Sequence, residues 1–193
     1  MNYSILVNKD HRLNSLFVPD DLIEIKGITT IKIDPNEKNM INKEALLYFC
    51  LLQNEAFLNG FEIFIDSAYR SYQYQEKLLQ SFVAKYKDEA YKICALPGAS
   101  EHQTGLAIDI LVRRNNLIVD EVKKDDPEIE WLMKNCYRFG YILRYPSDKE
   151  HLTGFKFEPW HYRYVGKNLA LELTISNNTL EEYYAKNLIR VKK

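Results

Sequence analysis

The order of its periodic segments is the feature that most constrains how this chain can fold. Helical patterns of apolar residues cover 42–59, 72–87 and 126–139, and the chain ends in a further helical segment. Segments with strand character are short, and they are found at 61–65, 106–112, 117–119, 141–143, 155–157 and 160–165. Because the two kinds of segment do not alternate as βαβ units do, the order predicts an α+β fold: a small antiparallel sheet with helices packed around it.

Turn and cap residues support several of these boundaries. Asn59-Gly60 and Gly140 stand where two of the helical patterns end, and Asn115-Asn116 separates two strand segments that can form a hairpin. Thr179 precedes Glu182 by three residues, the spacing of a capping box that opens the C-terminal helix. The first 40 residues show no strong period, so they are expected to form an irregular arm.

The size and charge of the chain exclude several classes of protein. Its 193 residues contain no repeat, low-complexity tract or linker, so a single domain over 1–193 is expected. The 26 basic and 27 acidic side chains give a net charge of −1, which argues against a nucleic-acid or membrane-surface partner. No stretch has the apolar length of a membrane span. The oligomeric state, a homodimer included, stays open.

The cysteines and the N-terminus predict a cytoplasmic location. Cys50, Cys94 and Cys136 are odd in number and far apart, so they are expected to be free thiols rather than a disulfide frame or a CxxC metal site. The first ten residues lack the basic region followed by an apolar region that a signal peptide requires.

Two short motifs gather side chains that could bind a metal. His102 and Asp109 stand seven residues apart around Gly105, and Glu158 precedes His161 by three residues. Three N/O ligands, an open coordination position and an adjacent carboxylate are what a catalytic zinc site requires. Taken alone, each of these residues would more often be a surface histidine, an exposed glutamate or an aspartate paired with a basic side chain.

The expected local structure brings these side chains together. In a strand over 105–111, Asp109 faces away from the apolar residues of the other face, and a half-buried carboxylate is costly unless it is paired or bound to metal. The odd spacing of Glu158 and His161 would place them on opposite faces of a regular strand. A bulge or kink at Pro159 is therefore predicted, which would bring both side chains to one face.

The charged residues can be assigned different roles. The shorter Asp109 suits the metal, whereas Glu158 can take a proton from the attacking water and pass it to the leaving group. Arg70 follows the first strand segment and could stabilise a developing oxyanion, although its spacing alone favours a surface salt bridge. His11 and His151 are expected to be solvated, with His151 as the spare ligand.

Three blocks of sequence, in a fixed order, carry a resemblance to a known family. They are Ser67-Ala68-Tyr69-Arg70-Ser71-Tyr72-Gln73-Tyr74-Gln75, Ser100-x-His102-x-x-Gly105-x-Ala107-x-Asp109 and Glu158-x-Trp160-His161-x-Arg163-Tyr164-Val165-Gly166. These blocks resemble the VanY-type D-alanyl-D-alanine carboxypeptidases, zinc peptidases of the fold shared with lysostaphin-like enzymes (the LAS or hedgehog-like fold). The segment 96–105 is most similar to the cytoplasmic VanXY enzymes, which act on D-Ala-D-Ala and on the precursor that ends in it.

The resemblance implies roles for the matched residues at the metal. It makes His102, Asp109 and His161 the Zn²⁺ ligands and Glu158 the catalytic base. It also makes Arg70 the group that stabilises the carbonyl oxygen, in place of a surface salt bridge.

The resemblance also implies residues that contact the substrate. Gln75 and Ser100 would bind its terminal carboxylate. Ser67 occupies a position where some dual-activity relatives carry an aspartate, which could receive the free ammonium of a dipeptide. A serine cannot match that charge, so the chain leans towards carboxypeptidase activity.

The leading hypothesis is a zinc D,D-carboxypeptidase that removes D-Ala from peptidoglycan precursors and is tied to glycopeptide resistance, with the D-Ala-D-Ala dipeptide as a second substrate. An L,D-carboxypeptidase or a peptidoglycan endopeptidase would keep the metal site and change the substrate. A zinc-stabilised module that binds D-Ala termini is the non-enzymatic alternative, and it would require a defective water-activating group.

Overall fold

The computed structural model describes residues 2–26 and 39–191, and the stretch 27–38 of the expected irregular arm lies outside the described residues. Two short antiparallel strands, β1 (Leu22–Glu24) and β2 (Met40–Asn42), lead into helix α1 (Lys43–Leu58). The Asn42 side chain caps α1 by accepting hydrogen bonds from the backbone N–H groups of Glu44 and Ala45, at 3.0 Å each.

Five strands form the central sheet within the described part of the chain. Across the sheet they run β3, β4, β7, β6, with β5 paired to β4, and every pair is antiparallel. Their bounds are Glu62–Ser67 (β3), Ala107–Arg114 (β4), Leu117–Val119 (β5), Tyr141–Leu143 (β6) and His161–Tyr164 (β7). The predicted α+β class with a small antiparallel sheet is therefore confirmed.

The hairpin between β4 and β5 forms where the asparagine pair predicted it. Asn115 has φ 51° and Asn116 has φ 65°, so both residues adopt the left-handed conformation. A two-residue turn with positive φ at both positions matches the twist of the flanking strands, and asparagine tolerates this conformation better than most residues.

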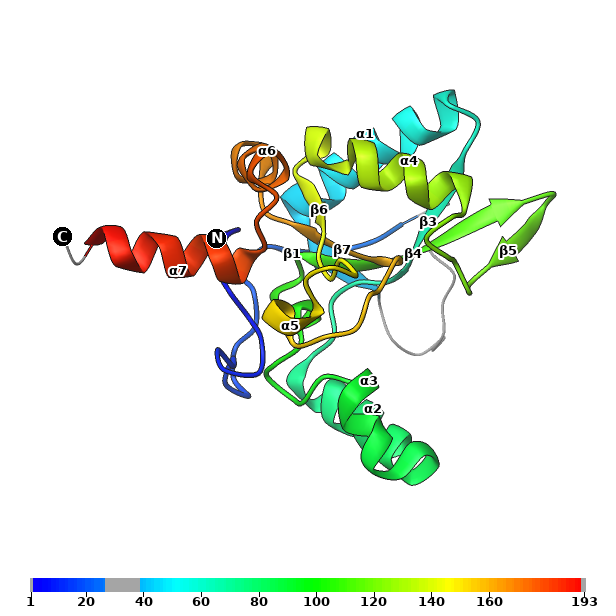
Figure 1. Cartoon of the computed structure of the whole chain (residues 1–193). Helices are drawn as coiled ribbons and strands as arrows, with labels where there is room; N and C mark the ends of the chain where they lie inside the picture. The colour runs from blue at the N-terminus through cyan, green and yellow to red at the C-terminus, as the bar shows by residue number, and fades with distance from the viewer. Residues whose placement is uncertain (1, 27–38, 192–193) are drawn as a thin grey trace.

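The main core lies between one face of the sheet and helices α1 and α4 (Pro127–Asn135), which Figure 1 shows on the same side of the sheet. Alternate β4 residues, Ile108 and Ile110 among them, point into this core, and each fully buried aliphatic side chain contributes roughly 1.5–3 kcal/mol. The intervening Asp109 therefore points to the opposite face.

The buried stripe of α1 differs from the expected one. Ala45, Phe49, Leu52 and Ala56 face the core, whereas Phe57 is 65% exposed and Cys50 is exposed. The apolar pattern over 42–59 predicts both residues on the buried face of this helix, and that prediction is wrong. The four buried residues are spaced four, three and four positions apart, as one face of a helix requires. Phe57 does not fit this spacing, so its side chain points to the solvent.

Helices α2 (Tyr72–Tyr86) and α3 (Ala90–Ile93), joined by the 3₁₀ turn η1 (Lys87–Glu89), lie on the other side of the sheet from α1 and α4 (Figure 1). The α2 pattern was expected to give a buried inner face, but among its described side chains Gln75 alone is fully buried. Leu78 and Phe82 are half-buried because they line a cavity instead of a core.

The segment that precedes β7 is a turn. Residues 155–157 form no strand, so that prediction is wrong, and β7 begins only at His161. The backbone N–H of His161 donates to the carbonyl of Glu158 at 3.2 Å, which closes a tight turn with Pro159 at its second position.

The remaining elements are short 3₁₀ turns and helices outside the sheet. They are η2 (Glu101–Thr104), η3 (Cys136–Phe139), α5 (Glu150–Thr153), α6 (Lys167–Ser176) and α7 (Leu180–Val191). The predicted capping box at the start of α7 is present: Thr179 N–H donates to Glu182 Oε2 at 2.9 Å, and Glu182 N–H donates to Thr179 Oγ1 at 3.3 Å. None of the helices in the described ranges combines the length and the apolar character needed to cross a lipid bilayer.

Candidate active site

Neighbouring strands bring the two sequence motifs together on the face of the sheet opposite α1. In the ladder between β4 and β7, Asp109 is directly opposite His161. His102 lies on η2, one turn before β4, and Gly105 with φ 68° reverses the chain between them. Strand pairing thus makes neighbours of Asp109 and His161, which are 52 positions apart in the sequence. The turn η2 places His102 beside them.

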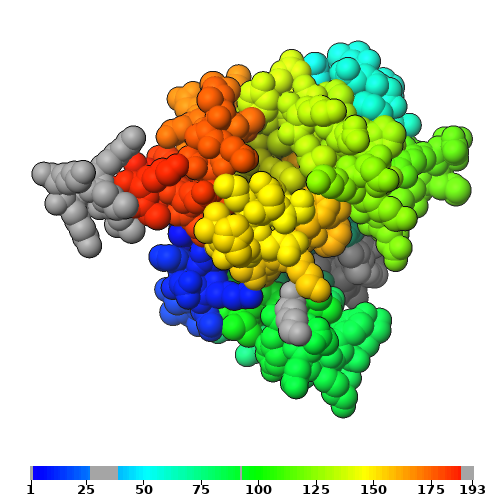
Figure 2. All heavy atoms as spheres, in the orientation of Figure 1, coloured from blue at the N-terminus to red at the C-terminus, as the bar shows by residue number. Residues whose placement is uncertain are grey.

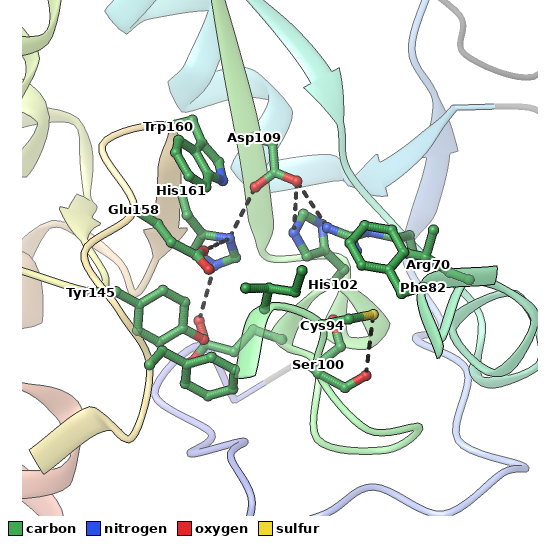
Figure 3. Close-up of a pocket in the computed structure, with 15 residues that line it drawn as sticks. Arg70, Phe82, Cys94, Ser100, His102, Asp109, Tyr145, Glu158, Trp160 and His161 are labelled. Carbon is green, nitrogen blue, oxygen red and sulfur yellow. Dashed lines mark hydrogen bonds and ion pairs between the residues drawn. The ribbon is translucent and has the colours of Figure 1, made fainter. Parts of the chain in front are cut away.

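The three predicted ligands offer atoms that all lie within 4.8 Å of one another. His102 Nε2 is 3.3 Å from Asp109 Oδ2, and His161 Nδ1 is 3.0 Å from Asp109 Oδ1. Figure 3 shows the two imidazoles on either side of the carboxylate, with Arg70 beyond one and Glu158 beside the other. The arrangement has the donor set and compactness of a mononuclear metal site.

The orientation of His102 tests whether a metal fits. Its Nδ1 lies 2.5 Å from the carbonyl oxygen of Ala68, which fixes the ring and leaves Nε2 directed at the cluster. Nε2 is buried and makes no hydrogen bond with any described residue. Histidine ligands to metals commonly bind a backbone carbonyl through the other nitrogen, so Nε2, which faces Asp109 Oδ2 at 3.3 Å without forming a hydrogen bond, fits a coordination bond.

The charges of the cluster also suit a cation. Burial and the nearby Arg70 lower the pKa of His102 to about 4, so its ring is neutral near pH 7. Burial opposes the charge on Asp109, but the two histidines and Arg70 hold the pKa of that carboxyl well below its usual range. Burial likewise opposes a charge on His161, yet the adjacent carboxylates raise its pKa to about 9. A metal would displace that proton, because ligand histidines bind in the neutral form.

Glu158 lies beside the cluster without belonging to it. Its Oε2 is 3.8 Å from His161 Nδ1, and its side chain is 20% exposed on the wall of the cavity. The turn at Pro159, instead of a bulge inside a strand, brings Glu158 and His161 to one face. Burial raises the pKa of Glu158 to about 7, although the charge of His161 acts the other way. A carboxyl in that range can both accept and return a proton near neutral pH.

Arg70 lines the same cavity, and its ion pair is with Asp109 instead of a surface residue. Its Nη2 is 2.8 Å from Asp109 Oδ2, and its Nη1 donates to Gln75 Oε1 at 3.3 Å. Its backbone N–H donates to the carbonyl of His102 at 3.2 Å. These contacts fix the guanidinium next to the His102–Asp109–His161 cluster, where it could stabilise a developing negative charge.

A cavity of about 360 Å³ opens over these side chains. Leu78, Phe82 and Ile93 form one wall, and Tyr145, Phe155 and Trp160 contribute to the other. In Figure 2 the α2–α3 unit is the green lobe below the yellow segment that leads to Glu158. The cavity thus combines apolar walls with a few convergent polar groups, which is typical of a site for a small ligand.

The residues expected to contact a substrate carboxylate lie at different depths. Ser100 lines the cavity and is 6% exposed. Gln75 lies behind Arg70: its amide nitrogen donates to Ala95 O at 2.8 Å and to Cys94 Sγ at 3.3 Å, so it is outside the cavity lining.

Three further residues named from the sequence lie away from the cavity. Ser67 pairs with Asp109 in the β3–β4 ladder and is not part of the cavity lining. His11 and His151 are exposed outside the metal cluster, as expected for solvated side chains. The three cysteines are free thiols in the structure, and Cys94 lines the cavity.

Sequence reasoning missed a buried ion cluster behind the site. Glu101 binds Arg144 Nε at 2.8 Å and Arg163 Nη1 at 2.9 Å, and the side chains of all three residues are fully buried. On the far side, Arg144 Nη2 is 2.6 Å from Glu181 on α7. The available signal was an arginine inside a strand of aromatic residues, since a charge at a buried strand position requires a partner.

Comparison with known proteins places the chain among peptidases. The family model VanY, D-alanyl-D-alanine carboxypeptidase, matches residues 38–167. The Bacillus subtilis (strain 168) protein YodJ, named as a carboxypeptidase, is 38% identical over 186 residues, which cover 96% of this chain and 68% of YodJ.

Solved structures show the same fold. The LdcB LD-carboxypeptidase matches with a TM-score of 0.83 and 37% identity, covering 94% of this chain and 85% of that chain. A mutant of the vancomycin resistance D,D-pentapeptidase VanY, in complex with Zn(II), matches with a TM-score of 0.79 and 31% identity. The match covers 95% of this chain and 99% of that chain. VanYB in complex with D-alanine-D-alanine matches with a TM-score of 0.78 and 33% identity, covering 95% of this chain and 97% of that chain. The fold is that of the LAS zinc peptidases, as the sequence resemblance implied.

Proposed function

The chain belongs to the VanY family of D-alanyl-D-alanine carboxypeptidases, and from that premise we propose that it is a zinc-dependent D,D-carboxypeptidase. Its substrates would be peptidoglycan precursors that end in D-Ala-D-Ala, from which it releases the terminal D-Ala. The observation that carries the proposal is the convergence of His102, Asp109 and His161 within 4.8 Å, next to a free carboxylate in the same cavity.

Zinc is the metal that these residues suit best. Two imidazoles and one carboxylate form a three-ligand set that leaves a coordination position open, as in catalytic zinc sites, and a VanY neighbour is in complex with Zn(II). When bound, zinc would polarise the scissile carbonyl and lower the pKa of a water molecule.

Glu158 and Arg70 would carry out the proton transfer and the charge stabilisation. Glu158 accepts a proton from the attacking water and then donates it to the leaving amine of D-Ala. Arg70 donates hydrogen bonds to the carbonyl oxygen as negative charge develops on it, in exchange for part of its contact with Asp109. Gln75 would hold the guanidinium in place through its 3.3 Å contact with Nη1.

The cavity also supports an assignment of the substrate end. The Ser100 hydroxyl lies in the cavity and can donate to the terminal carboxylate, with Gln75 contributing through Arg70. Ser67 offers no charge for the ammonium of a free dipeptide, so a precursor peptide would be preferred over D-Ala-D-Ala. Removal of D-Ala-D-Ala termini would link the enzyme to glycopeptide resistance.

The test is D-Ala release from a D-Ala-D-Ala-ending pentapeptide and from the dipeptide, each with and without a chelator. We expect faster release from the pentapeptide, loss of release with the chelator, and recovery on addition of Zn²⁺. Zinc-loaded protein that binds the pentapeptide without releasing D-Ala would instead indicate a binding module.

The similarity to LdcB supports one alternative, an L,D-carboxypeptidase that trims tetrapeptides. This enzyme would use the same metal site but release D-Ala from a different residue, one of L configuration in place of D-Ala. Including a tetrapeptide in the same assay separates the two functions, because a D,D-carboxypeptidase leaves it intact.

A further inference from the structure

We infer that Glu101 is a positioning residue for the metal ligand His161. Its buried carboxylate accepts the Nε2–H of that imidazole and so reserves Nδ1 for the metal. The inference rests on the metal site of the proposed function and extends it to a residue outside the cluster of ligands.

The two histidines present different nitrogens to the cluster. His102 points Nε2 at Asp109 and binds the Ala68 carbonyl through Nδ1. His161 does the reverse: its Nδ1 lies 3.0 Å from Asp109, and its Nε2 points away from the metal position. Each ring therefore needs a second group that selects its tautomer, and for His161 the group on that side is Glu101.

The contact joins two atoms that have no other partner. Glu101 Oε2 lies 3.7 Å from His161 Nε2, and both atoms are buried without a hydrogen bond to any described residue. A small rotation of either side chain would close this distance to a hydrogen bond, which would satisfy a buried donor and a buried acceptor at once. Leaving both unpaired would cost the desolvation free energy of each group without compensation.

Two arginines hold Glu101 as a carboxylate in a fixed position. Its other oxygen, Oε1, is 2.8 Å from Arg144 Nε and 2.9 Å from Arg163 Nη1. Arg163 is itself fixed, because its Nη2 donates to the backbone carbonyls of Tyr3 and Ile5 at 3.0 and 2.9 Å. The guanidinium groups thus occupy Oε1 and leave Oε2 directed at His161, which a purely structural ion cluster does not require.

The chain offers a matched pair of variants to test this role. Glu101→Gln retains the shape and the oxygen facing the arginines, but it replaces the acceptor at His161 with an NH₂ group that cannot accept a hydrogen bond. Glu181→Gln removes one negative charge from the same Arg144, which it contacts at 2.6 and 3.0 Å, and does not face His161. Both variants weaken the ion cluster, whereas Glu101→Gln alone affects the ligand.

The first readout is zinc affinity, measured by competition with a chelator on the full chain. We expect Glu101→Gln to bind zinc about 10–100-fold more weakly than the unmodified protein, as is usual when the partner of a ligand histidine is lost. Glu181→Gln should bind zinc with unchanged affinity. Equal zinc affinity for Glu101→Gln and the unmodified protein, or an equal loss in both variants, would overturn the inference.

The second readout needs no variant, so it decides the matter even if Glu101→Gln fails to fold. Imidazole ¹⁵N NMR of the zinc-loaded protein should show His161 coordinated through Nδ1, with a proton on Nε2 that exchanges slowly with solvent. Coordination through Nε2, or a rapidly exchanging Nε2 proton, contradicts the role of Glu101. Failure of the unmodified protein to bind zinc would overturn the proposed function itself, and the inference with it.

Discussion

Glu158 shows how one side chain can lie close to the His102–Asp109–His161 cluster and still remain outside it. It is 3.8 Å from His161 Nδ1, and its position is set by the turn at Pro159 instead of the strand ladder. The other members of the site are tied to Asp109 or to backbone carbonyls. The free carboxylate is therefore the group that can exchange a proton with a substrate.

Replacing this carboxylate should separate metal binding from turnover. We expect Glu158→Ala to retain zinc at one equivalent and to lose D-Ala release by about 10²–10⁴-fold, since the other carboxylates of the cavity lining, Glu101 and Asp109, are paired with arginines. Metal content by mass spectrometry and D-Ala release measure the two effects. Glu172→Gln, at an exposed position on α6, is the control, and full release by Glu158→Ala would refute the assigned role.

Arg70 should be sensitive even to a conservative change. Arg70→Lys retains the charge but cannot contact Asp109 and Gln75 with two separate nitrogens, as the guanidinium does. We expect kcat to fall by about 10²-fold, with a smaller change in KM, because the lost interaction acts on the developing charge. Arg113→Lys is the matched control, since Arg113 pairs with Glu62 outside the cavity. Equal kinetics for the two variants would contradict this role.

At the scale of single residues, the sequence predicted which three side chains lie close together better than it predicted their surroundings. His102, Asp109 and His161 stand in short motifs with rare residue types, so their convergence could be predicted. The arginine in the aromatic strand β7 signals that a buried partner exists, but the sequence does not identify it, because Glu101, Arg144 and Glu181 are brought together by tertiary contacts between η2, the end of β6 and α7. Sequence spacing carries no information about such long-range pairs.

Among the elements, the turn η2 and strand β4 determine the site. The left-handed Gly105 lets the chain reverse after His102, and a Cβ at this position would lie 2.6 Å from Leu22 Cδ2 and 3.3 Å from the backbone nitrogen of Asn42. The turn is therefore constrained both by its own backbone and by the packing of the N-terminal strands β1 and β2.

The two glycines Gly105 and Gly60 allow these constraints to be separated. Both have positive φ, but a Cβ at Gly60 would meet nothing within 4 Å. We expect Gly60→Ala to lower the free energy of unfolding by roughly 1–2 kcal/mol from backbone strain alone. Gly105→Ala should lower it further and also weaken zinc binding, because η2 carries His102. Chemical denaturation and metal content test both effects, and identical behaviour of the two variants would exclude a packing constraint at Gly105.

Helices, strands and turns were predicted correctly where neighbouring residues determine the structure. The prediction was wrong where contacts between distant parts of the chain determine it. Asn115-Asn116 produced the expected hairpin, and Thr179 with Glu182 formed the expected cap. Residues 155–157 have strand-like composition but form no ladder, and Phe155 instead lines the cavity. The apolar residues of α2 are likewise used as a cavity wall, which a periodic pattern cannot distinguish from a core.

On the scale of the whole molecule, α7 is joined to the site through charges. Glu181 binds both terminal nitrogens of Arg144, at 2.6 and 3.0 Å, and accepts from Asn8 at 3.2 Å. Arg144 in turn contacts Glu101 at 2.8 Å. The C-terminal helix, the N-terminal arm and the region behind the His102–Asp109–His161 cluster are therefore connected by one set of mostly buried charges.

This connection predicts a pH-dependent stability. Burial opposes the charge on Glu181, but Arg144 outweighs it and lowers the pKa of that carboxyl, so the folded state binds its proton less readily than the unfolded chain. The stabilisation is present above the unfolded pKa and is lost as pH falls through the folded pKa. We expect Glu181→Gln to lower the free energy of unfolding by about 1.5–3 kcal/mol at pH 7 and by less under acidic conditions. Denaturation curves across pH test this, and a difference that stays constant with pH would contradict it.

The most direct test of the central claim is a crystal structure of the zinc-loaded protein, with diffraction recorded on both sides of the zinc absorption edge. We expect one ion bound by His102 Nε2, Asp109 and His161 Nδ1, with Glu158 close by but not coordinated. An ion that is fully coordinated by protein groups, Glu158 among them, or an ion bound elsewhere on the chain, would contradict the account.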